Sequence, residues 1–247
     1  MTTITLITPV WNNANCIGHC LRSIKDQATA CQHILVDGGS TDGTLEIIRQ
    51  QKTAEAILIS EPDQGMYDAI NKGLELANGE VVGILNADDF FPTADVLEKV
   101  ASAFADHEVD ASYGDLLYVD REDTNKVIRT WRSGDYKRER FYTGWMPPHP
   151  TFYLRRCLYQ QHGGYRLDLG TAADYELMLR MLLKHRATAV HIPEVLVHMR
   201  NQGMSNASIS NRLKANRNDR LAWRVNGIRP RPWTLVAKPL GKIRQWL

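Results

Sequence analysis

Short apolar runs alternate with helix-like segments over the first ninety positions of the chain. Four of these runs predict strands, at residues 4–7, 34–36, 56–59 and 81–85. The segments between them have apolar positions three or four residues apart and predict helices, at 15–25, 44–51 and 67–77. Because the strands are apolar throughout rather than at every second position, we expect a mainly parallel sheet with helices on both faces.

Polar side chains follow three of these predicted strands. Asn12, Asp37 and Asp88 each lie at or just past a strand end. Right-handed crossovers bring the carboxyl ends of parallel strands to one edge, which is where open α/β sheets bind ligands. We therefore expect the three side chains to converge.

The second half of the chain has a less regular pattern. It predicts helices at 96–104 and 175–183 and strands at 112–119, 126–131 and 189–192. Residues after about 206 are helix-prone and basic, and prolines interrupt them. The prediction is an α/β domain over 1–205, with a regular first half (1–95) and a less regular second half (96–205), followed by a helical basic extension over 206–247.

Composition limits the class of protein. A chain of 247 residues with 43% hydrophobic content can bury a substantial core. It contains no run approaching the ~20 apolar residues that span a bilayer. Residues 1–4 contain no basic segment, so no signal peptide is expected. The four cysteines contain no CxxC pair, which fits a reducing, cytoplasmic compartment.

The formal net charge of +2 hides an asymmetry. Residues 206–247 hold ten of the 30 basic side chains and one of the 28 acidic ones, so the part before them has an excess of seven acids. Three of the six tryptophans, Trp223, Trp233 and Trp246, lie in the same segment. Such a segment suits an anionic membrane surface. The alternative is a helix that packs on the α/β domain.

Two adjacent carboxylates follow the apolar run 81–85. In Asn86-Ala87-Asp88-Asp89 the acids repel each other unless a cation or hydrogen-bond donors compensate them. Hard divalent ions take oxygen ligands and often share them with substrate phosphates. The alternative is that Asp88 and Asp89 cap a helix beginning at 92–95.

The loop at 36–44 (VDGGSTDGT) joins a predicted strand to a predicted helix. Its glycines allow a close ligand approach, and it matches neither phosphate-binding glycine motif. An acidic loop repels phosphate, whereas its carboxylates can accept hydrogen bonds from a base or a ribose hydroxyl. The alternative is an ordinary turn in which Asp42 caps the following helix.

Five blocks, taken in order, resemble family 2 glycosyltransferases, which have the GT-A fold. The blocks are 8–12 (TPVWN), 36–44 (VDGGSTDGT), 61–73 (EPDQGMYDAINKG), 77–80 (ANGE) and 85–89 (LNADD). The segments 149–150 and 172–177 resemble the acceptor half of bacterial polysaccharide members. The resemblance covers roughly residues 3–205 and is nearest to colanic-acid and O-antigen type sugar transferases. It implies that residues 1–95 are the nucleotide-binding half of the domain and residues 96–205 the acceptor half.

The resemblance implies a donor pocket. Pro9 and Asn12 would line it, and Asp37 would hydrogen-bond the nucleotide base. Gly65 and Asp68 would lie beneath the base and the ribose.

The resemblance also implies a metal site. Asp88 and Asp89 would contact the ribose and a Mg²⁺ or Mn²⁺ ion that bridges the diphosphate. Many members have Asp where this chain has Asn86, which leaves the division of roles between Asp88 and Asp89 open.

Asp174, at the start of a predicted helix, is the candidate catalytic base. Attack opposite the leaving group would invert the anomeric centre. A helix cap or an acceptor contact is the alternative role for Asp174, and Glu176 is the reserve base. His149 is expected either to reach a phosphate or the metal, or to pack against neighbours. Arg200, in a closing loop over 200–205, is a candidate diphosphate clamp.

These observations predict a metal-dependent inverting glycosyltransferase of exopolysaccharide or O-antigen biosynthesis. The expected donor is a UDP-hexose, with a GDP-sugar such as GDP-fucose as the alternative. The expected acceptor is a polyprenyl-diphosphate-linked glycan. The protein would be cytoplasmic, or peripheral at the inner face of the cytoplasmic membrane.

Three other classes of protein are alternatives to a glycosyltransferase. A nucleic-acid-binding protein is disfavoured by the acidic body and the lack of a recognisable motif, so no nucleic-acid partner is expected. A nucleotidyltransferase would need a basic residue in the loop 36–44. A non-catalytic nucleotide-sugar-binding module stays open.

Overall fold

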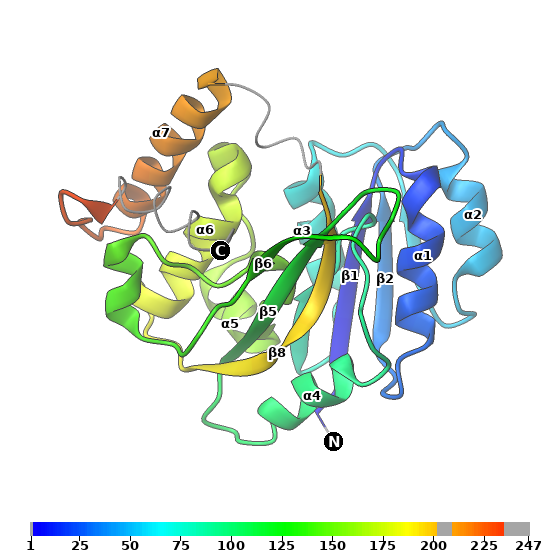
Figure 1. Ribbon diagram of the computed structural model, residues 1–247, viewed down its shortest axis with the longest axis horizontal. Coiled ribbons are helices and arrows are strands. Elements are labelled where there is room, and N and C mark those ends of the chain that lie inside the picture. The colour runs from blue at the N-terminus through cyan, green and yellow to red at the C-terminus, as the bar shows by residue number, and fades with distance from the viewer. Residues whose placement is uncertain (1, 202–208, 235–247) are drawn as a thin grey trace.

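A central sheet with helices on both sides organises the protein (Figure 1). The computed structural model describes residues 2–201 and 209–234, and in the second range the side chains from 216 onward. The strands are β1 (Ile4–Val10), β2 (Gln32–Asp37), β3 (Ile57–Ser60), β4 (Val81–Ile84), β5 (Ala111–Val119), β6 (Val127–Trp131), β7 (Tyr153–Arg155) and β8 (Ala189–Arg200).

Helices connect most of these strands. The α-helices are α1 (Ala14–Lys25), α2 (Thr44–Gln51), α3 (Met66–Leu76), α4 (Val96–Ala103), α5 (Arg156–His162), α6 (Ala173–Met178) and α7 (Ile209–Val225). The 3₁₀ helices are η1 (Arg138–Thr143), η2 (His149–Thr151) and η3 (Leu167–Ala172), and the π-helix η4 (Leu179–Lys184) continues α6.

The described strands form one eight-stranded sheet of order β3-β2-β1-β4-β7-β5-β6, with β8 beside β5. Strands β1 to β4 pair in parallel, as predicted. Strand β7 is antiparallel to both β4 and β5, whereas β8 is parallel to β5. The fold class is therefore the predicted mixed α/β fold with a mainly parallel central sheet.

The apolar strands have a core on each face. In β1, Leu6 packs with Ile17 of α1 on one face, while Ile7 packs with Ile70 of α3 on the other. All four side chains are buried. Strands covered on both faces need apolar residues at successive positions, which explains the continuous runs in the sequence.

The sheet is narrowest at the three-residue strand β7, which joins the first four strands to β5. Tyr153 of β7 lies against Gly83 of β4, and a Cβ at Gly83 would come within 2.1 Å of the Tyr153 ring. A side chain at position 83 would therefore push the two strands apart.

Helix α7 packs on the body of the domain rather than standing free. Trp223 is fully buried, donates a hydrogen bond of 3.0 Å from Nε1 to the hydroxyl of Tyr175, and lies 5.2 Å from the ring of Tyr142. The described part of the predicted extension thus shares the core of the second half of the domain, the alternative that the sequence left open. Trp246 lies outside the described residues.

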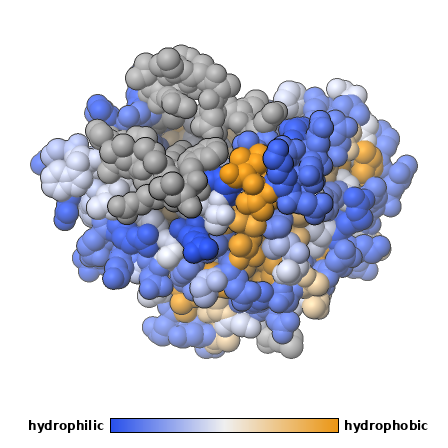
Figure 2. All heavy atoms as spheres, viewed as in Figure 1, coloured by the Kyte–Doolittle hydropathy of each residue, from blue (hydrophilic) through white to orange (hydrophobic). Residues whose placement is uncertain are grey.

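Hydrophobic residues are sparse on one face of the molecule (Figure 2). Figure 2 shows a mostly hydrophilic face with one narrow hydrophobic strip across its middle. Within residues 2–201 and 209–234, no helix has the length and apolar character needed to cross a membrane.

Candidate active site

The loops after β1 and β2 are bonded to each other. Asn12 has a left-handed backbone (φ 47°), and its Oδ1 accepts a hydrogen bond of 2.9 Å from the amide of Thr41. The amide of Asn12 donates in return to Ser40 Oγ at 2.8 Å. Asparagine tolerates this conformation better than most residues. The predicted convergence of the strand-end loops is thus observed for β1 and β2.

Asp42 bridges the starts of two helices. Its carboxylate accepts hydrogen bonds from the amides of Ala14 and Thr44, each at 3.1 Å. The hydrogen bond from the Thr44 hydroxyl is the main reason that the pKa of Asp42 is lowered. The capping role that the sequence offered for Asp42 is therefore present, and it extends to the beginning of α1.

Asp37 is fully buried at the end of β2. Its carboxylate accepts hydrogen bonds from Ser60 Oγ at 2.7 Å and from the amides of Ser40 and Gly39 at 3.2 and 3.3 Å. These contacts fix the glycine-rich loop. Pro9, also buried, lies beside this strand end, opposite Val36. Contact of Pro9 and Asp37 with a nucleotide stays a prediction.

Gly65 and Asp68 form the start of α3. Gly65 has a φ of 113°, a conformation that favours glycine. Asp68 is 19% exposed, and its Oδ2 accepts a hydrogen bond of 3.0 Å from the amide of Gln64. The loop before Gly65 also approaches the glycine-rich loop, because a Cβ at Gly38 would lie 2.5 Å from Asp63 Oδ2. These positions line the same sheet edge as Asn12.

Asp88 and Asp89 differ in environment. Asp88 is half-buried, whereas Asp89 is fully buried. Asn86 Nδ2 donates to Asp89 Oδ2 at 3.0 Å, while Asp89 Oδ1 and Asn86 Oδ1 are buried without a hydrogen-bond partner among the described residues. Burial, and then the charge of Asp88, raises the pKa of Asp89 well above its usual range. The alternative that the pair caps a helix is wrong, since α4 begins at Val96 after Asp95.

The sequence suggested that Arg200 lies in a closing loop, and the structure shows that it does not. It is the last residue of β8, is 5% exposed, and donates from Nη1 to the main-chain oxygen of Asp88. Its Nη2 lies 2.7 Å from His19 Nδ1. Because arginine can only donate, His19 Nδ1 must accept. Burial, and then Arg200, lowers the pKa of His19, which favours that neutral imidazole. Residues 202–208 of the predicted loop lie outside the described residues.

The acidic end of β4 fits a divalent cation. No three described His, Cys, Asp or Glu side chains form a ready-made metal cage. Asp88 is nevertheless half-buried, and Oδ1 of the buried Asp89 has no hydrogen-bond partner among the described residues. An ion that takes one or two carboxylates and completes its shell with phosphate and water suits such a site. Of the two carboxylates, Asp88 is the one that solvent reaches and that could ligate such an ion directly.

Asp174 lies in the first turn of α6, with 14% of its side chain exposed. Its Oδ1 accepts a hydrogen bond of 2.7 Å from the amide of Tyr175, and its Oδ2 lies 3.4 Å from His149 Nδ1. The Tyr67 hydroxyl of α3 is hydrogen-bonded to Asp174. Burial and the Asp174 charge together raise the pKa of Tyr67 well above its usual range. Asp174 is thus held by residues from three separate segments.

Two of the sequence expectations change at this point. His149 packs against Asp174, a pairing that the sequence did not anticipate. Glu176, the reserve base, is 1% exposed and forms an ion pair of 3.0 Å with Arg180. Glu176 therefore has a structural role.

The Tyr118 side chain is affected by the charges of both Asp89 and Asp174. Burial raises the pKa of Tyr118 in β5, the Arg129 guanidinium opposes that shift, and the charges of Asp89 and Asp174 add to it. Arg129 Cζ lies 3.8 Å above the Tyr118 ring. The charges of Asp89 and Asp174 thus both reach the Tyr118 side chain.

The sequence reasoning missed Tyr67, Tyr118 and His19 as site residues. Tyr67 lies inside the block 61–73, so its position could have been inferred from that block. Tyr118 and His19 carry no local signal, because their roles depend on strand pairing and on Arg200.

Comparison with known proteins supplies the family context. The family model described as Glycosyl transferase family 2 matches residues 5–163. The chain is 34% identical over 212 residues to the PGL/p-HBAD biosynthesis glycosyltransferase of Mycobacterium bovis, covering 83% of this chain and 80% of that protein. It is 35% identical over 121 residues to glycosyltransferase AglE of Haloferax volcanii, covering 47% of this chain and 40% of that protein.

Solved structures share the fold. The mannosyltransferase PcManGT from Pyrobaculum calidifontis, solved with GDP-Man and Mn²⁺, has a TM-score of 0.66 at 21% identity, covering 98% of this chain and 74% of that one. Staphylococcus aureus TarS 1–349, solved with UDP-GlcNAc, has a TM-score of 0.68 at 19% identity, covering 91% of this chain and 66% of that one. Identities this low show the similarity of fold alone.

Proposed function

The chain belongs to glycosyl transferase family 2, with the GT-A fold, and we propose that it moves a hexose from a nucleotide-sugar donor to a glycan acceptor with inversion. The observation that carries this proposal is the acidic pair after β4, in which Asp88 is half-buried and the buried Asp89 has an Oδ1 without a hydrogen-bond partner among the described residues. A displacement reaction needs charge stabilisation at the leaving group and a base at the attacking hydroxyl. The acidic pair after β4 and Asp174 provide groups suited to these two tasks.

The donor would lie across the ends of β1, β2 and β4. Asn12, Asp37 and the start of α3 at Gly65 surround that edge, and we propose that they hold the base and the ribose. Asp88 would hold a Mg²⁺ or Mn²⁺ ion, with Asp89 beneath it. A bound divalent ion would neutralise the charge that develops on the departing nucleoside diphosphate.

Asp174 would act as the general base. Its carboxylate takes the proton of the acceptor hydroxyl while that oxygen forms a bond to the anomeric carbon. The bond from the anomeric carbon to the phosphate oxygen breaks, and its electron pair leaves with the nucleoside diphosphate. Tyr67 and His149 would orient the carboxylate during this step. A positioned base contributes about 10²–10⁴-fold to the rate of such a reaction.

Donor and acceptor are inferred more broadly. A UDP-hexose is our default donor and a GDP-sugar the alternative, since PcManGT was solved with GDP-Man and TarS with UDP-GlcNAc. We propose a lipid-linked glycan acceptor in exopolysaccharide or O-antigen synthesis, at the cytoplasmic side of a membrane.

Thermal shift measurements would test donor binding. UDP, GDP and dTDP are compared with and without Mn²⁺, because a ligand that binds the folded state raises the melting temperature. The preferred nucleotide then identifies a radiolabelled sugar donor for turnover. Asp174→Asn should bind the donor normally and lose turnover, while Asp168→Asn, a change of an exposed acid in η3, should keep it. Donor binding without turnover in the unsubstituted chain would favour a non-catalytic module.

A further inference from the structure

The end of α7 and the loop after it form a basic concave surface, here called the arginine hollow. It encloses about 490 Å³ and is lined by Arg220, Arg224, Arg229 and Arg231 together with Ile228 and two prolines. All four arginines are exposed. None of the described side chains that line the hollow is acidic. The hollow therefore concentrates positive charge on a body whose first 205 residues have an excess of acids.

The hollow is preformed. Thr234 Oγ1 accepts a hydrogen bond of 3.1 Å from the Arg231 amide and donates one of 2.7 Å to the main-chain oxygen of Tyr142. The amide of Ile228 donates to the Trp223 main-chain oxygen at 3.1 Å. Trp223 itself is fully buried. A ligand of the hollow would thus not have to order the loop first.

Aromatic rings hold Arg231. Its Cζ lies 5.3 Å from the centre of the Tyr142 ring and 5.8 Å from that of Trp233. A guanidinium near aromatic rings keeps the N–H groups at its edge available for phosphate. Trp233 is 54% exposed, so an indole lies next to the arginines at the surface.

We infer that the arginine hollow docks the protein on anionic phospholipid headgroups of a membrane. The inference rests on the proposed function, because a lipid-linked acceptor is presented at such a surface. Clustered arginines bind headgroup phosphates, and exposed tryptophan prefers the headgroup level. The loop after α7 lies at the outer edge of the molecule, so a flat surface can reach it (Figure 1). A long nucleic acid would in addition meet the acidic body.

Docking there would place the catalytic centre near the lipid surface. Trp223, which precedes Arg224 of the hollow in α7, is hydrogen-bonded to Tyr175, which follows Asp174 in α6. The hollow and the proposed base therefore belong to two helices that contact each other.

Vesicle flotation with the full chain tests the inference. Vesicles of phosphatidylcholine containing phosphatidylglycerol are compared with vesicles of phosphatidylcholine alone. Each arginine near an anionic surface contributes ~1 kcal/mol, which is about fivefold in partitioning. The variant with all four arginines of the hollow changed to Gln should therefore partition more than ~100-fold less into the anionic vesicles.

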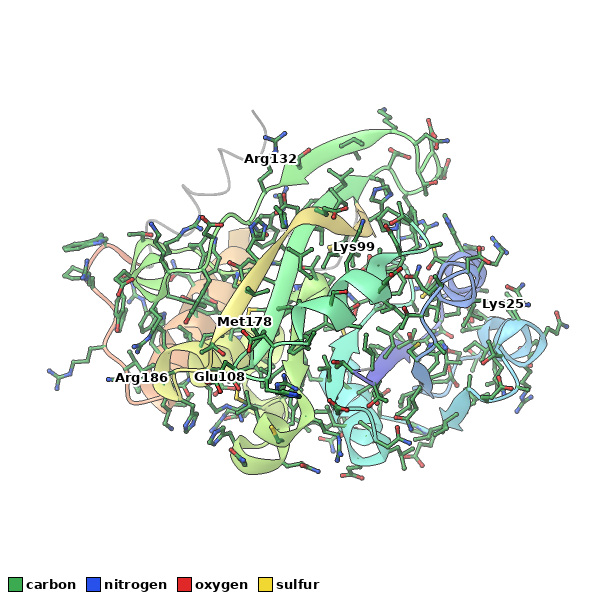
Figure 3. The ribbon with its side chains drawn as sticks, turned by 90° about the horizontal axis from the view of Figure 1, so that it is seen from below. Lys25, Lys99, Glu108, Arg132, Met178 and Arg186 are labelled. Carbon is green, nitrogen blue, oxygen red and sulfur yellow. The ribbon has the colours of Figure 1, made fainter. Side chains whose placement is uncertain are left out.

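A matched variant removes four exposed positive charges elsewhere, by changing Lys25, Arg49, Arg121 and Lys126 to Gln. Lys25 lies on the side of the molecule opposite the loop after α7 (Figure 3). This variant should retain binding within a few-fold of the unsubstituted chain. If the first variant does not fold, Arg229→Gln/Arg231→Gln replaces it, with an expected loss of ~25-fold.

Equal binding to both vesicle types, or unchanged binding after loss of the hollow arginines, would overturn the inference. The inference would also be overturned if the chain did not bind the vesicles but bound duplex DNA, and if the same arginine changes abolished that binding. Vesicle binding is measured without donor. A chain that floats with vesicles but turns over no donor contradicts the proposed function alone, and the reverse result contradicts the docking surface alone.

Discussion

The Arg200 guanidinium donates a hydrogen bond to the main-chain oxygen of Asp88, although the two residues are 112 positions apart in the chain. This contact joins the end of β8 to the end of β4. The buried Arg200 charge also opposes the rise in the pKa of Asp89 that burial and the charge of Asp88 cause. The acidic centre therefore depends on a residue from the far end of the domain.

Removing Arg200 should destabilise the protein. Arg200→Met would leave Asp89 buried with less compensation, and breaking a buried charge arrangement costs about 3–5 kcal/mol. We expect the free energy of unfolding in urea to fall by that order. Arg121→Met, at an exposed position, should change it by less than about 0.5 kcal/mol. A small effect at Arg200 would mean that the contact contributes little.

The two carboxylates after β4 should respond differently to amide substitution. Asp88→Asn removes the proposed direct ligand, so the extra rise in melting temperature that Mn²⁺ gives to nucleotide binding should disappear. Asp89→Asn replaces a buried carboxylate that burial disfavours, so the metal-free protein should melt at the same or a higher temperature. Loss of the Mn²⁺ effect in Asp89→Asn but not in Asp88→Asn would reverse the assignment.

Tyr67 should affect turnover more than donor binding. Tyr67→Phe removes the hydroxyl that is hydrogen-bonded to Asp174, and we expect kcat to fall roughly tenfold while the donor-induced thermal shift is kept. Tyr136→Phe, which removes a hydroxyl bonded to the main chain of Leu182, is the control and should leave kcat unchanged. A fall in donor affinity with unchanged kcat would assign Tyr67 to the donor pocket.

His33 should make the protein sensitive to acid. Burial lowers its pKa to about 4, and the ring lies 3.0 Å from Thr8 Oγ1. Between pH 6.5 and 4 the unfolded chain binds a proton that the folded chain does not, so stability falls as the pH is lowered through this window. The loss is roughly 3 kcal/mol. In His33→Gln, urea titrations across the same window should show a flatter dependence, and an unchanged slope would argue against the buried neutral imidazole.

Trp223 should anchor α7. Trp223→Ala would leave a large cavity beside Tyr175 and is expected to lower the free energy of unfolding by about 3–5 kcal/mol. Trp233→Ala, at an exposed position, should cost less than about 0.5 kcal/mol. Equal effects would mean that α7 does not share the core. Truncation after residue 205 would remove the buried Trp223 along with the arginine hollow. Its effect on membrane binding could therefore come from loss of stability.

The first ninety residues were predictable because their structure is locally encoded. Helix α2 has the predicted bounds, and the strands β1 to β4 and the helix α3 lie within a few residues of expectation. Each parallel strand is an apolar run, and each helix has its own periodicity. The order of the loops along the sheet edge then follows from the crossover rule, which is why Asn12 and Asp37 were expected together.

The second half was less predictable because its structure depends on distant contacts. Strand β7 is three residues long and exists only between β4 and β5, and β8 runs to Arg200 rather than ending at 192. Apolar and polar residues alternate only weakly over positions 193–200, because β8 pairs with β5 in an irregular register. The sequence therefore placed Arg200 in a loop, and the pairing of His149 with Asp174 had no local signal.

The contact of Gly83 with Tyr153 has a consequence for protein engineering. Chimeras that graft the acceptor half of one enzyme onto the nucleotide half of another must carry both residues across the junction as a unit. In a chimera that keeps Tyr153 but has alanine at position 83, the alanine Cβ would disrupt the pairing of β4 with β7, even if all the active-site residues were intact. An exchange at this strand pair should therefore preserve the sheet only when the Tyr153 ring and its facing Gly83 are exchanged together.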